Sequence, residues 1–333
     1  MTRDQLSLFG APPPRSPVGP APVRPELKAL AAALPRSVRF GTSSWSFPGW
    51  VGLVWDRKAT DRVLSRHGLA AYAQHPLLRA VGLDRTHYQP MDEAAMAGLA
   101  AAVPDDFRFL VKAHDHITLA RFPDHPRFGA RRGETNPRFL DASYANDVVL
   151  GPTGRAMGPK LGTLLLQFAP QPPEVLGGPR AFAERLRRFL EQLPDDMPVA
   201  VEIRNAELLG DDYAEALLAT GTRHCVNVLE RMPPPQTQSR LARCARQDGL
   251  VVRWMLARGM DYGAAKAGFA PFDALVAEDP SNRRAVASLM AEATLAGHET
   301  TCIINNKAEG SAPRSIVQLA KALLQELDAA SEP

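Results

Sequence analysis

The segments GTLLLQF, residues 162–168, and VAVEIR, residues 199–204, decide the fold class. Each is a short apolar run typical of a buried parallel strand, and each carries a polar residue near its carboxyl end. Three further runs have the same form: FRFLVKA (107–113), LVVRWM (250–255) and TCIINN (301–306). A charge inside a buried strand is costly unless it is paired. Its repetition at successive strand ends therefore predicts a shared site at the mouth of an α/β barrel.

Strand-like and helix-like segments alternate from Val38 to the end of the chain. The expected strands are 38–45, 80–88, 107–113, 162–168, 198–204, 223–229, 250–256 and 300–306, and the clearest helices are 179–193, 283–297 and 313–327. Eight such units predict an α/β fold, a TIM (β/α)8-type barrel, over residues 37–328. A doubly wound open sheet is the alternative, but no GxGxxG motif follows the first strand. Two long insertions, 114–139 and 230–248, are expected as βα loops that cover the mouth.

Composition limits the class of protein. The formal net charge of +3 gives no strong global attraction for nucleic acid, so any such contact requires a local basic patch. The three cysteines form no CxxC pair, which favours a reducing cytoplasm over a disulfide framework. No apolar run approaches the ~18–20 residues of a membrane span, and no signal peptide is evident.

Three side chains are predicted to be catalytic: Lys112, Glu202 and Asp84. Glu202 and Arg204 are two residues apart on a strand and share a face, so they form either an acid/base or anion clamp or a structural ion pair. Lys112 is a compact cation that could hold an anion or, when desolvated, act as a base or Schiff-base amine. A salt bridge from Lys112 to Glu202 or Asp84 is the alternative, and the two roles are compatible.

A second set is predicted to line the site and bind substrate. Its members are Gln167, Arg204, Arg253, Asn305, Asn306, Tyr88 and Trp45. Asn305 and Asn306 precede Lys307 and a turn, GSAP, that opens a helix. This arrangement is either a phosphate site or a simple helix cap. Trp45 is either a stacking platform or a packing residue.

A metal site is also considered, because His87, His114 and His116 fall near strand ends. Barrel enzymes build metal sites there from His, Asp and Glu. No HxxxH or HxH-plus-acid set is compelling, so no metal ligand is assigned. The cofactor stays unknown, with a divalent metal as an open alternative.

Residues 1–36 are predicted to be a disordered, proline-rich tail. Its start, Gln5-Leu6-Ser7-Leu8-Phe9, looks like the pentapeptide that binds the bacterial sliding clamp. Leu6, Leu8 and Phe9 would anchor in an apolar groove, and Gln5 would supply a directional amide.

Several motifs together carry a family resemblance. They are RFGTSSWSFPGW (39–50), HYQP (87–90), FRFLVKA with a following Ile-Thr (107–118), LLLQFAP (164–170), VEIRN (201–205), RW (253–254) and INNKAEGSAP (304–313). The chain resembles the YecE-like family, domain of unknown function 72, over about 38–327. The resemblance implies a TIM-type barrel and no settled activity. Gly82 and Asp84 stand where the family usually has Glu-x-Asn, and Thr118-Leu119 stands where Thr-His is common.

The sequence thus predicts a cytoplasmic barrel enzyme whose mouth binds an anionic, phosphate-bearing substrate. Tethering to the sliding clamp would suggest hydrolytic or phosphodiester chemistry in nucleic-acid processing or DNA repair. A sugar or sugar-phosphate enzyme and a non-catalytic clamp-associated binding module are the alternatives.

Overall fold

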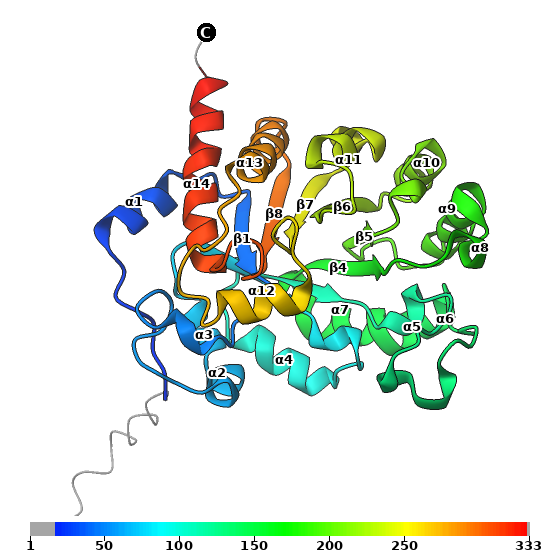
Figure 1. Ribbon diagram of the computed structural model, residues 1–333, viewed down its shortest axis with the longest axis horizontal. Helices are drawn as coiled ribbons and strands as arrows, with labels where there is room; N and C mark the ends of the chain where they lie inside the picture. Colours follow the sequence, from blue (N-terminus) through cyan, green and yellow to red (C-terminus); the bar gives the residue numbers. More distant parts are fainter. Residues whose placement is uncertain (1–16, 332–333) are drawn as a thin grey trace, which may run out of the picture.

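The computed structural model describes residues 17–331, and its centre is a closed barrel of parallel strands in the order β1-β2-β3-β4-β5-β6-β7-β8 (Figure 1). The strands are β1 (Val38–Thr42), β2 (Leu78–Leu83), β3 (Arg108–Lys112), β4 (Leu161–Phe168), β5 (Val199–Ile203), β6 (Arg223–Val228), β7 (Gly249–Trp254) and β8 (Glu299–Ile304). Each of the eight predicted strands overlaps an observed one, although β2 ends at Leu83 and not at residue 88, and β8 pairs with β1 to close the sheet. The alternative of an open doubly wound sheet is thereby excluded.

Helices surround the barrel and connect consecutive strands (Figure 1). The longer ones are α1 (Pro25–Ala33), α2 (Asp61–His67), α4 (Glu93–Ala101), α7 (Gly151–Met157), α9 (Gly178–Leu190), α10 (Asp211–Ala219), α11 (Pro235–Leu241), α12 (Tyr262–Phe269), α13 (Pro280–Leu295) and α14 (Ala312–Ala329). The short ones include α3 (Leu69–Tyr72), α5 (Asp115–Thr118), α6 (Ala142–Tyr144) and α8 (Pro173–Leu176). The three helices expected from the sequence correspond to α9, α13 and α14. No described helix combines the length and the hydropathy needed to cross a bilayer.

The interior of the barrel is filled in layers. Its middle is one buried apolar cluster with members from seven strands: Ala80, Leu110, Leu165, Ala200, Cys225, Val251 and Ile303. Successive side chains on a strand alternate between the two faces, so the residue two positions further on also points inward. On β3, β4, β5 and β7 that residue is polar: Lys112, Gln167, Glu202 and Arg253. The alternation therefore places one polar layer above the apolar one, at the carboxyl ends of the strands.

The insertion at 114–139 does follow β3 at this end of the barrel. It holds α5 and a short helical segment, η3 (Pro126–Arg131). The Asn136 side chain donates to the carbonyls of His116 and Leu119 at 2.7 and 2.6 Å, and Gln171 accepts from the Ala120 N–H at 2.8 Å. The loop is thus fastened to the mouth by buried hydrogen bonds.

The expectation of a second lid at 230–248 is wrong. This segment contains α11 and the short η7 (Cys244–Arg246), and it leads from β6 to β7 as an outer-ring helix (Figure 1). The Gln238 side chain accepts from the Asn227 N–H at 3.1 Å and donates to the Asn227 carbonyl at 2.7 Å. The proline run at 233–235, read as loop sequence, instead opens the helix, where proline is well suited.

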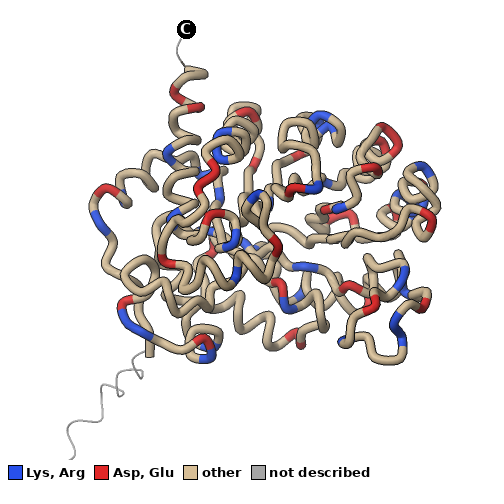
Figure 2. Tube along the Cα trace, viewed as in Figure 1, with Lys and Arg blue, Asp and Glu red and all other residues tan. Residues whose placement is uncertain are grey.

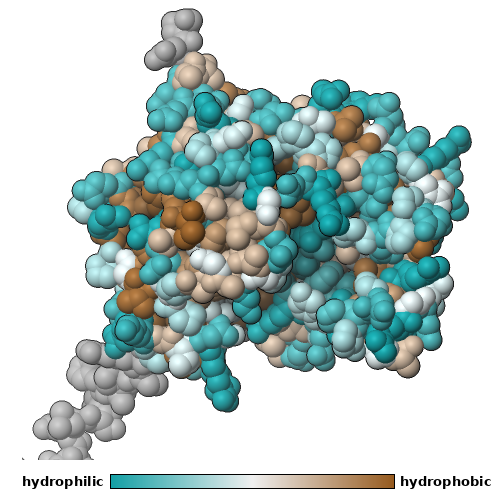
Figure 3. Space-filling model, in the orientation of Figure 1, coloured by the Kyte–Doolittle hydropathy of each residue, from teal (hydrophilic) through white to brown (hydrophobic). Residues whose placement is uncertain are grey.

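The prediction of disorder for residues 1–36 is wrong for residues 17–36. Residues 17–36 are described and lie on the barrel, with Val18 buried and Pro20 paired with Trp55 in a β-bridge. α1 then packs Leu27 and Leu30 toward the core. α1 and α14 border a groove of about 690 Å³, near hydrophobic surface that Figure 3 shows. Proline is well suited to the first position of a helix, as in α1, so a proline-rich segment can still form ordered structure here.

Candidate active site

A buried ion-pair network occupies the polar layer at the mouth. Glu202 is fully buried, and its Oε1 accepts from the Arg204 Nε at 2.7 Å. Its Oε2 accepts from Nη1 of Arg253, a guanidinium that is 1% exposed. Both carboxylate oxygens are therefore engaged by arginines from β7 and from the residue that follows β5.

Two more predicted site residues join the same network. The Gln167 Oε1 accepts from Nη2 of Arg204 at 2.9 Å and from Nη1 of Arg253 at 3.2 Å. The Asp84 Oδ1 lies 3.4 Å from Nη2 of Arg253, which links the end of β2 to β7 across the barrel. The structure thus brings together Asp84, Gln167, Glu202, Arg204 and Arg253, which the sequence predicted at one place.

The network fixes the charge of Glu202. Burial alone would raise the pKa of Glu202, but the charges of Arg253 and Arg204 and their hydrogen bonds lower this pKa to about 2. Burial would likewise lower the pKa of Arg253, but the charges of Glu202 and Asp84 raise it. Glu202 is consequently a permanent anion that orients two guanidinium groups, and a role as a proton donor or acceptor near neutral pH does not fit it.

Lys112 differs from its neighbours because it has no partner. It ends β3 and is 5% exposed, and within residues 17–331 its ammonium makes no hydrogen bond or ion pair. Burial lowers the pKa of Lys112 to about 8, although the charges of Asp84 and Glu202 act in the opposite direction. The alternative, a salt bridge from Lys112 to Glu202 or Asp84, is absent from this part of the chain. The mouth therefore holds a desolvated amine close to its titration point.

The segment after β2 is fastened beside Lys112. The Thr86 hydroxyl donates to the Lys112 carbonyl at 2.7 Å, and Nδ1 of His87 lies 3.1 Å from the Ala113 carbonyl. Burial, together with the charge of Lys112, lowers the pKa of His87 to about 3, so this ring is neutral at pH 7. Tyr88 follows directly and is 62% exposed. It is thus placed at the mouth with its ring available, as its predicted binding role requires.

The turn after β8 is closed by its own side chains. The Asn305 Oδ1 accepts from the Lys307 N–H at 3.0 Å, and the Asn306 Oδ1 accepts from the Ala312 N–H at 2.8 Å. Asn306 and Ser311 are almost completely buried. The side chain of Asn306 already occupies the start of α14, so the geometry favours the helix-cap alternative over a phosphate site.

Trp45 is a packing residue, and its predicted role as a stacking platform is wrong. Its ring is 4% exposed and belongs to the main hydrophobic core. The indole N–H donates to the Leu64 carbonyl at 3.1 Å, which holds α2 against the segment after β1. A tryptophan in a strand-end loop has the same sequence signature in either role, which is why the sequence left both open.

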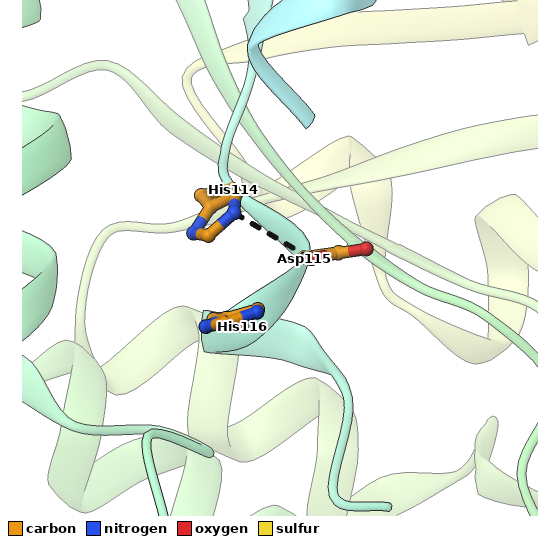
Figure 4. A group of neighbouring side chains, drawn as sticks. All are labelled: His114, Asp115 and His116. Atoms are coloured by element: carbon orange, nitrogen blue, oxygen red, sulfur yellow. Dashed lines mark ion pairs between the residues drawn. The ribbon is translucent and has the colours of Figure 1, made fainter. Parts of the chain in front are cut away.

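One group of side chains has the composition of a metal site. His114, Asp115 and His116 offer ligand atoms that all lie within 4.8 Å of one another. In Figure 4 the two rings lie one above the other, and a dashed line joins the His114 ring to Asp115, whose Oδ1 lies 3.7 Å from the His114 Nε2. Asp115 already pairs with Arg127, and Nδ1 of His114 lies 2.7 Å from the Tyr144 hydroxyl. A cation here would compete with Arg127 for the carboxylate, so no metal is assigned.

Sequence reasoning missed two residues at the mouth, Arg127 and Tyr262. Arg127 comes from η3 and places its guanidinium 4.9 Å from the centre of the Tyr88 ring. Tyr262 opens α12 after β7 and is 61% exposed. The sequence did carry a signal, since each residue lies in a segment that directly follows a strand.

The family assignment rests on a match over almost all of the barrel. The model of the family described as "Protein of unknown function DUF72" matches residues 39–333. The chain belongs to the DUF72 family. The range begins at β1 and includes every strand that contributes to the polar layer. No curated protein matches the chain.

Solved structures of the DUF72 family share this fold. One is a DUF72 family protein from Enterococcus faecalis, with 18% sequence identity and a TM-score of 0.54 over 86% of this chain and 95% of that chain. Another is from Thermotoga maritima, also 18% identical with a TM-score of 0.54, over 87% of this chain and 99% of that chain. At this identity the similarity establishes the fold alone.

Proposed function

We propose that this DUF72 barrel is an enzyme that acts on an anionic, phosphate-bearing substrate bound at its mouth. The observation that carries the proposal is Lys112 at the carboxyl end of β3, a side chain 5% exposed whose ammonium has no ion pair or hydrogen bond among residues 17–331. Lys112, Arg204 and Arg253 supply three positive charges, whereas Asp84 and Glu202 supply two negative ones. A phosphate group would provide the missing counter-charge and form charge-assisted hydrogen bonds.

Each residue then has a distinct role. Lys112 contacts the substrate anion and, with a pKa of about 8, has about a tenth of its amines neutral at pH 7 and able to accept a proton. Arg204 retains a free Nη1 within the described network and adds a second donor. Glu202 and Gln167 hold the arginines in place, so they position the catalytic groups. This assignment replaces the expectation that Glu202 itself transfers protons.

The reaction class that fits these groups is hydrolysis or another phosphodiester or nucleotide reaction. Electrostatic stabilisation by preorganised cations is the largest contribution that proteins make to phosphoryl chemistry. A sugar-phosphate enzyme would use the same charges and is the second candidate. A non-catalytic clamp-associated binding module was expected to have Lys112 and Glu202 neutralised by each other and no free cavity, and the absence of that ion pair among residues 17–331 supports an enzyme instead.

The proposal is tested by ligand stabilisation at low salt. Inorganic phosphate, pyrophosphate, ribose 5-phosphate and AMP are added separately to the full chain, and the melting temperature is recorded. Phosphate-bearing ligands should raise the melting temperature of the wild type, because a ligand that binds only the folded state stabilises it. The Lys112→Met variant should lose this shift.

Lys321→Met is the matched control, because Lys321 is exposed on α14 and its replacement removes the same charge. This variant should respond to the ligands as the wild type does. A phosphate response that persists in Lys112→Met would remove Lys112 from the site. No response to any of the four ligands in the wild type would overturn the proposal as a whole.

We further propose that residues 5–9 bind the bacterial sliding clamp and bring the barrel to DNA. This pentapeptide lies outside the described residues. Val18 is the first buried residue among those that the structure describes, so residues 10–17 would form the connection. Eight residues span at most about 28 Å when fully extended. Proximity to DNA supports a nucleic-acid substrate over a free sugar phosphate.

A fluorescent peptide of residues 1–20, titrated with purified clamp, should bind, and replacing Leu8 and Phe9 by alanine should weaken binding at least about tenfold. Loss of buried apolar anchors has effects of this size. Replacing Arg15 by alanine leaves the anchors intact and serves as the control. Equal binding of the peptide with and without Leu8 and Phe9 would make the resemblance accidental.

A further inference from the structure

Two exposed aromatic rings stand at the mouth. Among the strongly exposed large hydrophobic side chains of residues 17–331, only Tyr88 and Tyr262 are aromatic, at 62% and 61% exposure. Tyr88 follows β2 and Tyr262 follows β7, so both belong to the carboxyl end of the barrel. Tyr72 and Tyr213, in contrast, are buried and hydrogen-bonded. Exposure of an aromatic ring is therefore a local property of the mouth.

A cation lies over each exposed ring. The Arg127 guanidinium is 4.9 Å from the centre of the Tyr88 ring, and Nζ of Lys307 is 4.0 Å from the centre of the Tyr262 ring. Such cation–π contacts orient a ring while leaving much of its surface free. The two tyrosines are thus held in place and still available for stacking.

Both rings belong to the same site as Lys112. Tyr88 is two residues from Thr86, whose hydroxyl donates to the Lys112 carbonyl at 2.7 Å. Lys307, which lies over Tyr262, accepts at its carbonyl from the Ala257 N–H at 2.7 Å, beyond the end of β7. Burial and the charge of Asp84 raise the pKa of Tyr88, and Tyr262 contributes to the same increase. Tyr88 and Tyr262 therefore both stand on segments that are hydrogen-bonded at the carboxyl end of the barrel.

A basic segment continues outward from this site. It consists of residues 121–138, which follow α5. Figure 1 labels α5, and Figure 2 colours the charged residues in the same view. The arginines are Arg121, Arg127, Arg131, Arg132 and Arg138. Against them stand only Asp124 and Glu134, so this segment carries +3, as much as the whole chain. Arg121 and Arg131 make no ion pair within the described residues.

We propose that the mouth binds single-stranded nucleic acid. A nucleobase stacks on Tyr88 and Tyr262, its phosphate meets Lys112, and residues 121–138 follow the phosphates of flanking nucleotides. This inference rests on the proposed function, because it takes the phosphate at Lys112 as its starting point. It names the substrate class, which the charges alone left open.

Single strands fit the observations better than the other phosphate-bearing classes. A sugar phosphate has no planar aromatic group for two tyrosines and no further phosphates for the arginines. A duplex keeps its bases stacked on one another, and their faces are unavailable to side chains. Stacking on aromatic side chains combined with a basic path is the usual way that proteins hold single strands.

The test is a fluorescence-anisotropy titration of the full-length protein with a labelled twelve-nucleotide single strand, repeated at several salt concentrations. Replacing both tyrosines, Tyr88→Ala with Tyr262→Ala, should lower the affinity roughly tenfold or more. Arg121→Gln with Arg131→Gln should weaken binding and reduce the slope of log K against log salt concentration by about 1.4, since two phosphate contacts are lost.

Matched controls separate these effects from general loss of charge or surface. Arg240→Gln with Arg246→Gln removes two exposed arginines of the outer ring that make no ion pair among the described residues, and Leu295→Ala removes an exposed apolar side chain of α13. Both should leave binding unchanged. Circular dichroism of the tyrosine variants checks that the barrel stays folded.

Two results would overturn the inference. One is a single strand that binds equally well without both tyrosines, and the other is a duplex that competes as strongly as the single strand. If phosphate and pyrophosphate still stabilise the wild type through Lys112, the proposed function survives this failure. If they also fail, both proposals fall together.

Discussion

The Glu202→Gln variant is expected to be about 3–5 kcal/mol less stable than the wild type. Removing one partner of a buried ion pair leaves the other charge uncompensated, and losses of this size are typical. Here the uncompensated charge would be the guanidinium of Arg253, which is 1% exposed and whose principal counter-ion is Glu202. Urea denaturation at pH 7 measures the difference.

Glu93→Gln is the control for this variant. Glu93 pairs with Arg155 at 2.9 Å on the surface, where ion pairs contribute about 1 kcal/mol or less. The pH dependence supplies a second check, because the folded pKa of Glu202 is lowered to about 2. A lowered carboxyl pKa stabilises the folded state above the unfolded value of about 4.5, and this stabilisation is lost as the pH falls toward 2. A Glu202→Gln variant as stable as Glu93→Gln would contradict the network.

The Lys112→Met variant should be more stable than the wild type at pH 7, by about 3 kcal/mol at most. The pKa of Lys112 is lowered from 10.5 to about 8, and each pKa unit corresponds to about 1.4 kcal/mol. Methionine has a similar length and no charge to desolvate. Denaturation at pH 7 compares the two proteins, with Lys321→Met as the variant expected to show no gain.

The sign of the pH dependence follows from proton binding. Between about pH 8 and 10.5 the unfolded chain binds more protons at Lys112 than the folded chain does, so wild-type stability should rise with pH in this range. Lys112→Met lacks this contribution, and its advantage should disappear by about pH 10.5. A variant that is less stable than the wild type at pH 7 would mean that the ammonium has a stabilising partner. A stabilising substitution that abolishes ligand binding would illustrate the usual conflict between stability and a charged site.

The strands and their order followed from the sequence because buried parallel strands have a distinctive composition. Once β3, β4, β5 and β7 were located, the period of two placed Lys112, Gln167, Glu202 and Arg253 on one face. The partners of each charge did not follow, because pairing depends on distances across the barrel. The sequence did not indicate that Arg204 and Arg253 would both pair with Glu202 and that Lys112 would have no ion-pair partner among the described residues.

The predictions that were wrong concern residue types that occur in two different structural roles. Trp45 could bury a loop or stack a ligand, and only its exposure distinguishes the two roles. The prolines of residues 17–25 were read as evidence of disorder, but Val18 and α1 pack on the barrel. In 230–248 proline opens α11 in the outer ring. Tyr262 and Arg127 escaped notice because their function depends on neighbours that are distant in sequence.

The early burial of Val18 has a consequence for encounter rates. If residues 5–9 hold the sliding clamp, the barrel is confined to a sphere of about 28 Å around its attachment point. One molecule in that volume corresponds to an effective concentration on the order of ten millimolar. At that concentration a mouth with only millimolar affinity for single strands would be occupied most of the time at the clamp and almost never elsewhere. Weak binding at the mouth would then restrict the barrel to DNA that carries a clamp.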